Sequence, residues 1–268
     1  MKGIKILKKY KIETSNKNNM MLIKFVEKKY VEDFLNGEIH FTRLGYFIDL
    51  EKNHGDSIVG DINEGKALFS INPQKVHFYL VNDDGTLKED LGNVNMSSKH
   101  SKMRGYAIYP EVKSSGISCF SYLSLENDFD LIKVDGNIRS YSINKDIIEE
   151  LRKIGEGRIP IIMFQNPIYS AIKKNPSVLG NFDFSMNLVE YYKGESNNIS
   201  LKELKEDHFK PIFTKRDKYS NQRELRMVLK GDVKEGYNLN IGKLENAIPL
   251  KDFEMLSNLV LFLELKRL

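Results

Sequence analysis

Hydrophobic and polar residues near the start of the chain follow a strand–helix–strand pattern. The apolar run 20–26 predicts a buried strand, and residues 27–36 place their apolar side chains on one side of a short helix. Residues 38–44 then alternate between apolar and polar, which predicts a second strand. Because successive side chains of a strand point to opposite faces, we expect His40 and Arg43 on opposite faces of it.

The same kinds of pattern continue along the rest of the chain. Amphipathic spacing predicts helices at 144–154 and 201–207. Apolar runs of strand length predict further strands at 67–71, 76–81, 116–122, 159–164 and 188–192. With no convincing linker, this mixture predicts a single α+β domain over residues 1–268, with a mixed or antiparallel central sheet flanked by a few helices.

Several segments have patterns that need separate treatment. Residues 1–19 are locally basic, and we expect a tail or an edge element there. Residues 92–115 are polar and weakly patterned, which predicts a long surface excursion. Asn166-Pro167 predicts a turn. Residues 252–265 carry apolar side chains at helical spacing, so we expect a helix, although the run 259–263 also fits a buried strand.

Polar residues at alternate positions mark the segment that enters an apolar run near the C-terminal third. Gln222, Glu224 and Arg226 are expected to share one face of a strand, while the apolar residues between and after them face the core. This row brings a carboxamide, a carboxylate and a guanidinium together. The row is therefore the first candidate for a functional site.

The row has two interpretations. One is an exposed strand face on which Glu224 pairs with Arg226 or with a lysine of a neighbouring strand, and such pairs contribute only about 0.2–1 kcal/mol each. The other is the floor of an active site. A glutamate there can bind a ribose hydroxyl and stabilise the positive charge that develops when a C–N glycosidic bond breaks, and electrostatic stabilisation of this kind is usually the largest catalytic contribution. Spacing alone leaves both interpretations open.

Composition narrows the class of protein. The chain has 268 residues, 41 basic and 37 acidic, with a formal net charge of +4, and this balance does not demand a nucleic-acid partner. No apolar run reaches about eighteen residues, and lysines interrupt the apolar residues at the start, so we expect no membrane span and no signal peptide. Cys119 is the only cysteine, which fits a buried structural thiol in a cytoplasmic protein.

Motifs of several common active sites are missing from the sequence. There is no P-loop and no Gly-x-Ser-x-Gly elbow, and the five histidines lack the spacing of a zinc site, so no metal is expected. The acidic, glycine-rich segment 53–65 does not have the ligand spacing of a calcium loop. We expect a solvated turn there, with a substrate-facing loop as the alternative.

Gln222-Arg-Glu224 is similar to the Gln/Glu-x-Glu motif of ADP-ribosyltransferases, and the N-terminal strand–helix–strand is similar to the segment that opens their nicotinamide-binding half. The chain also resembles a broad group of functionally uncharacterised bacterial and phage proteins. The shared segments are Lys24-Phe25 with Leu35-Asn-Gly-Glu-Ile-His-Phe41, Ser118-Cys-Phe-Ser121, and Tyr219-Ser-Asn-Gln-Arg-Glu-Leu-Arg226. They span most of the chain.

The resemblance to ADP-ribosyltransferases implies a fold of that type, NAD as the donor, and a protein or nucleic-acid acceptor. It implies that Glu224 is the catalytic carboxylate, that Gln222 orients the acceptor, and that Arg226 is a charge partner at the cofactor site.

The resemblance also implies residues that hold the cofactor. These enzymes usually carry an arginine or a histidine on the first core strand, where this chain has only Lys24. Lys24, or His40 or Arg43 on the second strand, would therefore contact NAD, and Tyr46 would stack on the nicotinamide ring.

Other classes of function fit the same pattern. A non-catalytic interaction protein, such as a phage-encoded inhibitor or a sensor in anti-phage defence, would bind a partner protein through the 92–115 excursion. A nuclease or nucleic-acid binder is a third class, but no carboxylate cluster has metal-site spacing and the basic residues are not concentrated on one element. The sequence does not set the acceptor or the oligomeric state.

Overall fold

In the computed structural model, the described residues are 20–54, 60–71, 75–82, 86–95 and 103–264, so the expected N-terminal tail or edge element lies outside them. The largest element is an eight-stranded sheet whose paired strands are all antiparallel. Its strands are β1 (Met20–Val26), β2 (Glu38–Arg43), β7 (Gly116–Ser124), β10 (Ile159–Phe164), β11 (Asp183–Leu188), β14 (Glu224–Lys230), β15 (Gly236–Asn240) and β16 (Ile248–Pro249).

Both faces of this sheet are covered. On one face, apolar side chains of β1, β7, β10 and β14 pack with α1 (Val31–Leu35) and α6 (Gln165–Lys174). On the other face, alternate residues of β1 and β10 pack with α5 (Lys145–Gly155) and α8 (Phe253–Ser257). Leu22 and Ile23 show the alternation, because each is fully buried but they belong to opposite cores.

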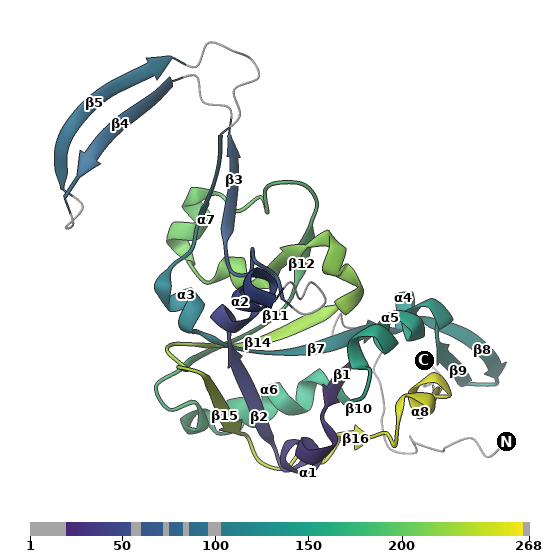
Figure 1. The fold of residues 1–268 in the computed structure, drawn as a ribbon. Coiled ribbons are helices and arrows are strands. Elements are labelled where there is room, and N and C mark those ends of the chain that lie inside the picture. The colour runs from purple at the N-terminus through teal and green to yellow at the C-terminus, as the bar shows by residue number, and fades with distance from the viewer. Residues whose placement is uncertain (1–19, 55–59, 72–74, 83–85, 96–102, 265–268) are drawn as a thin grey trace.

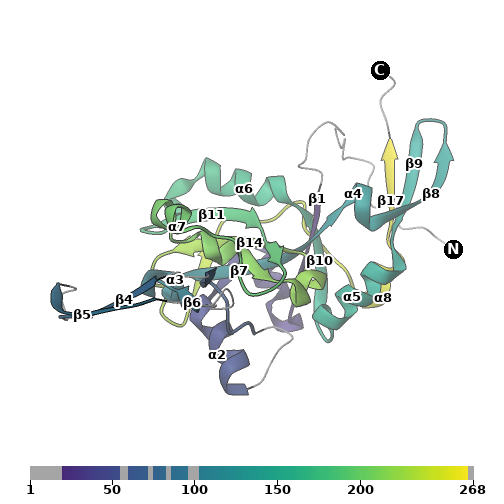
Figure 2. The same cartoon turned by 90° about the horizontal axis from the view of Figure 1, so that it is seen from above.

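Smaller sheets extend from the central one. They are β17–β9–β8 (Val260–Glu264, Ile138–Ile143, Phe129–Asp135), β3–β6 (Ala67–Ile71, Met103–Ala107), β4–β5 (Lys75–Val81, Leu87–Asn95) and the parallel pair β12–β13 (Glu190–Tyr192, Thr214–Arg216). The β3–β6 ribbon leads away from the central sheet and carries the β4–β5 hairpin at its far end (Figure 1). Seen from above, this hairpin and the β17–β9–β8 sheet lie on opposite sides of the molecule (Figure 2).

Four more helices lie in the described part of the chain. They are α2 (Leu44–His54), α3 (Pro110–Ser114), α4 (Leu125–Asp128) and α7 (Leu201–Glu206), with 3-10 turns η1 (Lys28–Tyr30), η2 (Pro176–Leu179), η3 (Lys210–Phe213) and η4 (Asp217–Gln222). Of these helices, α2 is as long as α5, at 11 residues. No helix in the described part of the chain has the length and apolar character that crossing a membrane requires.

The central sheet divides beside β7, and this division positions the site. β14 pairs with β7 along one side, from Gly116 to Ser121. On the other side, β2 pairs with β7 only at its start, and β1 pairs with β7 only from Ser121 onward. The backbone of residues 118–120 therefore has no strand partner on that side, and β1 and β2 diverge from it.

Much of the predicted fold is confirmed. The structure is a mixed α+β fold with a large antiparallel sheet and several helices. The strands predicted at 20–26 and 159–164 have those bounds, and the predicted helix at 144–154 is α5, which begins after Asn144 and buries Ile147, Ile148 and Leu151.

Other predictions are wrong. Asn166-Pro167 does not form a turn but lies in the first turn of α6, where the missing N–H of a proline has no helical partner to lose. The expected helix 252–265 ends at Ser257 as α8, and its second half is strand β17, as the alternative held, because it pairs with β9. Residues 92–115, predicted as a surface excursion, are not among these errors; their described part contains the end of β5 and the whole of β6 and α3.

Candidate functional site

Glu224 lies in a buried charge cluster that we define as Glu64, Lys215, Glu224 and Arg226. Arg226 Nε donates a hydrogen bond to Glu224 Oε2 at 2.6 Å, and Lys215 Nζ donates one to Glu224 Oε1 at 2.8 Å. Burial alone would raise the pKa of Glu224, but the charges of Arg226 and Lys215 outweigh it and lower the pKa to about 2. The carboxylate is therefore ionised at neutral pH.

The polar row of the sequence is present in a different form from the one expected. Gln222 does not lie on the strand, because η4 ends there and Arg223 takes a left-handed conformation with φ of 48° before β14 begins at Glu224. Lys215 nevertheless joins Gln222 to the row, since its Nζ donates to Gln222 Oε1 at 2.6 Å. The row is also not an exposed face, because Arg226 is only 1% exposed.

Glu64 and Lys215 are members of the cluster that the sequence patterns did not identify. Glu64 stands in the segment expected as a solvated turn, but its side chain is buried against Arg226 and 3.8 Å from Lys215 Nζ. Its Oε1 forms a close ion pair with Nη1 of Arg226, although neither of its oxygens meets the geometry of a hydrogen bond with a described residue. Burial raises the pKa of Glu64 despite these two cations. The two acidic residues Asp61 and Glu64 were the feature of this segment that could have indicated a place in the site. Both side chains are buried, so they also contribute to the packing of the fold.

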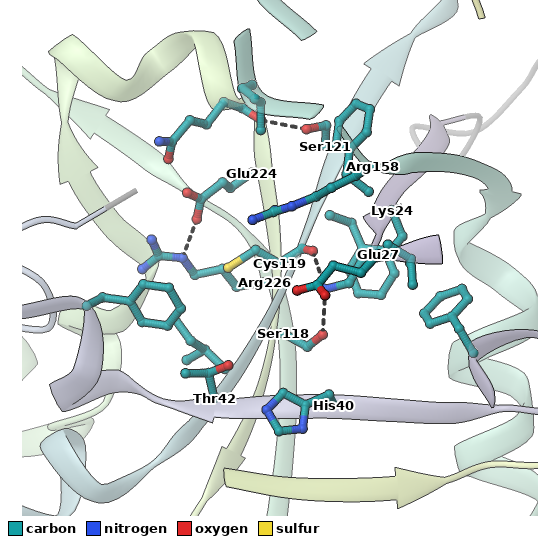
Figure 3. A pocket seen from close by; sticks show the side chains of 18 of the residues that line it. Lys24, Glu27, His40, Thr42, Ser118, Cys119, Ser121, Arg158, Glu224 and Arg226 are labelled. Carbon is teal, nitrogen blue, oxygen red and sulfur yellow. Dashed lines mark hydrogen bonds and ion pairs between the residues drawn. The ribbon is translucent and has the colours of Figure 1, made fainter. Parts of the chain in front are cut away.

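A cleft of about 780 Å³ opens where β1 and β2 diverge from β7, and Glu224 lies on its wall. Lys24, His40 and Tyr46, three of the residues predicted to contact the cofactor, line the same cleft. Figure 3 shows Lys24 and Glu224 entering it from different strands. The volume is in the range of sites for small molecules and cofactors, about 300–1,000 Å³.

Lys24 and Arg158 bring positive charge to this cleft. Lys24 Nζ donates to the carbonyl oxygen of Cys119 at 2.8 Å and to Ser118 Oγ at 3.0 Å, so it occupies the gap beside β7. Arg158, which the sequence patterns did not identify, precedes β10 and extends into the cleft (Figure 3). Among the described residues, neither cation forms an ion pair with a carboxylate, and burial, with a smaller contribution from Arg158, lowers the pKa of Lys24 to about 8.

The other predicted residues occupy distinct places. His40 Nδ1 lies 2.6 Å from Asn238 Oδ1 at the edge formed by β2 and β15. Tyr46 is half exposed and packs edge-on against Phe47, with ring centroids 5.7 Å apart. Arg43 is exposed and is not among the described residues that line the cleft.

The described side chains include no group of three His, Cys, Asp or Glu residues that is arranged to hold a metal ion. Arg223 links the start of β14 to its surroundings by an ion pair with Asp128 at 2.6 Å and a longer one with Glu150.

Comparison of the chain with protein-family models, with curated proteins and with solved structures gives no match.

Proposed function

We propose that the cleft binds NAD and that the protein transfers ADP-ribose from it to a protein or nucleic-acid acceptor. Glu224 stabilises the positive charge that develops on the ribose as the bond to nicotinamide breaks. The proposal includes an ADP-ribosyltransferase-like fold, which the N-terminal strand–helix–strand and the division of the sheet between β1 and β2 support.

One observation carries the proposal. The cleft combines the ionised carboxylate of Glu224 with Lys24 and Arg158, two basic residues that form no ion pair with a described carboxylate. NAD carries the complementary groups, a diphosphate for the guanidinium of Arg158 and a ribose carbon that becomes cationic for Glu224. Tyr46 and Phe47, which line the cleft, supply aromatic surface for a flat ring.

The direct test is the turnover of NAD by the Glu224→Gln variant. Removing one preorganised electrostatic group costs about 10²–10³ in kcat, so we expect at least that loss. Glu51→Gln is the control, because Glu51 also pairs with cations, Arg216 and Lys218, but lies outside the cleft. Circular dichroism and thermal melting show whether Glu224→Gln remains folded, and undiminished NAD consumption by the folded variant would refute the assignment.

One observation favours a second function, that of an interaction protein without catalysis. The β4–β5 hairpin stands away from the central sheet (Figure 1), and its residues Leu80, Leu87 and Leu91 are 43%, 62% and 54% exposed. Apolar side chains gathered on a projecting element are typical of a protein-binding surface. Removal of the hairpin tests this function.

A further inference from the structure

Glu224 is well suited to stabilise positive charge, but it is a poor base. Its two carboxylate oxygens accept hydrogen bonds from Lys215 and Arg226, and its pKa of about 2 means that it does not take up a proton near neutral pH. When an acceptor hydroxyl attacks the ribose, its proton must go to another group. Glu64 also lines the cleft, but it is only 1% exposed and its carboxylate pairs with the same two cations, so it is a poorer candidate for direct contact.

Lys24 has the environment that this second group requires. Among the described residues, its Nζ donates hydrogen bonds to two neutral oxygens, Ser118 Oγ and the carbonyl oxygen of Cys119. The charges of Cys119 and Glu224 raise the pKa of the amine, but burial lowers it more. Arg158 lies in the same cleft and repels a second positive charge. Lys24 is also placed at the gap in the sheet, on the cleft that Glu224 faces (Figure 3).

We propose that Lys24 is the general base of the reaction and that the acceptor atom is the oxygen of a hydroxyl group, with water as the simplest acceptor. This inference rests on the proposed function. The oxygen of water bonds to the anomeric carbon of the ribose while the bond from that carbon to the nicotinamide nitrogen breaks. The bonding electron pair leaves with nicotinamide and neutralises its ring, and the water proton passes to the neutral Nζ of Lys24, which later releases it to solvent.

The acidity of Lys24 is consistent with this role. A general base works best when its pKa lies near the working pH, and burial brings the pKa of Lys24 down to about 8. Near pH 7, about a tenth of the amines are then neutral. Arg158 can bind the diphosphate independently of Lys24, because a guanidinium donates two parallel hydrogen bonds to a phosphate.

The test measures NAD hydrolysis by the full-length protein as a function of pH. We expect kcat/KM of the wild type to rise with pH in the region around 8, because kcat/KM follows the pKa of the amine in the free protein. Lys24→Arg preserves the positive charge but cannot act as a base, so we expect kcat to fall about 100-fold with KM nearly unchanged, and the rise with pH to disappear. Lys133→Arg is the control, because Lys133 is exposed and pairs with Asp135 on β8, and neither residue lines the cleft.

Two further variants separate a base from a structural cation. Lys24→Ala should lose activity and recover part of it when small primary amines are added, because a free amine can enter the space and accept the proton. Arg158→Gln should move the rise in kcat/KM to higher pH, since Arg158 lowers the pKa of Lys24. If Lys24→Arg is as active as the wild type with the same pH profile, Lys24 serves only as a cation. A wild type that consumes no NAD overturns the proposed function itself, and the inference with it.

Discussion

At the scale of single residues, Glu64 and Glu224 share the same two cations but differ in their hydrogen bonds. Glu224 accepts one from Lys215 and one from Arg226, whereas neither oxygen of Glu64 accepts any from a described residue. The pKa of Glu224 is accordingly lowered to about 2, and the pKa of Glu64 is raised. Two nearby carboxylates with diverging pKa values are characteristic of sites that divide chemical roles between them.

This divergence predicts opposite pH dependences of stability. The pKa of Glu224 falls from 4.5 to about 2 on folding, so its ionised form stabilises the protein above pH 4.5, and that stabilisation is lost as the pH falls toward 2. At neutral pH, Glu224→Gln should lower the free energy of unfolding by about 3–5 kcal/mol, because it leaves two buried cations, Lys215 and Arg226, with Glu64 as their one remaining partner in the cluster. The difference from the wild type should narrow in acid, as measured by urea unfolding at a series of pH values.

Glu64→Gln is the matched variant for this measurement. The pKa of Glu64 is raised on folding, so its ionisation costs stability as the pH rises above 4.5. The wild type should therefore lose stability relative to Glu64→Gln with rising pH, the reverse of the trend for Glu224→Gln. Parallel curves for the two variants would show that the carboxylates are not held differently.

Residue-scale prediction from the sequence succeeded where partners are close in the chain. The identity and spacing of Glu224 and Arg226 were enough to place them together, and they form an ion pair at 2.6 Å. Lys215 and Arg158 were missed, because η4 and the order of the strands bring them to the cleft, and no local spacing records that. Glu64 was placed in a solvated turn, since a turn composition does not reveal which side chains fold inward.

At the scale of elements, the turn between α1 and β2 depends on a close backbone approach. Gly37 has a φ of +91°, and a Cβ built on it would lie 1.9 Å from the carbonyl oxygen of Gly242. We expect Gly37→Ala to lower the free energy of unfolding by about 3 kcal/mol, since left-handed strain of about 1–2 kcal/mol adds to overpacking of about 1–3 kcal/mol. Thermal or urea unfolding measures this loss.

Gly136 is the control for this prediction. It also has a positive φ, +59°, but a Cβ there meets nothing within 4 Å. Gly136→Ala should therefore cost only the strain of about 1–2 kcal/mol. Equal losses in the two variants would mean that the contact of Gly37 with Gly242 does not constrain the turn.

A helix or strand was predictable from the sequence when its own residues showed a clear apolar run or periodicity. β1 and β10 have the predicted bounds because each is an apolar run that ends in charged or helical sequence. The segment 259–263 formed β17 rather than continuing a helix, because pairing with β9, more than a hundred residues earlier, outweighs a local periodicity. β5 is a strand in a polar region without such a signal, since it forms by pairing with β4, which the apolar run 76–81 predicted.

At the scale of the whole molecule, the candidate site and the projecting hairpin are separate. The cleft lies where the central sheet divides, and its lining includes no residue of β3, β4, β5 or β6 among those described. The hairpin stands at the far end of the β3–β6 ribbon (Figure 1). The two proposed functions therefore reside on different parts of the chain and can be tested independently.

Replacing residues 72–102 by Asn-Gly removes the hairpin and leaves a tight turn between Ile71 and Met103, which are paired neighbours in the β3–β6 ribbon. Because the cleft does not use this segment, we expect the shortened protein to keep its NAD turnover and to melt within a few degrees of the wild type. If the hairpin is the binding surface of an interaction protein, a partner co-purified with the wild type will be lost from the shortened protein but kept by Glu224→Gln. Loss of turnover on shortening would instead tie the hairpin to catalysis and contradict the separation of the two regions.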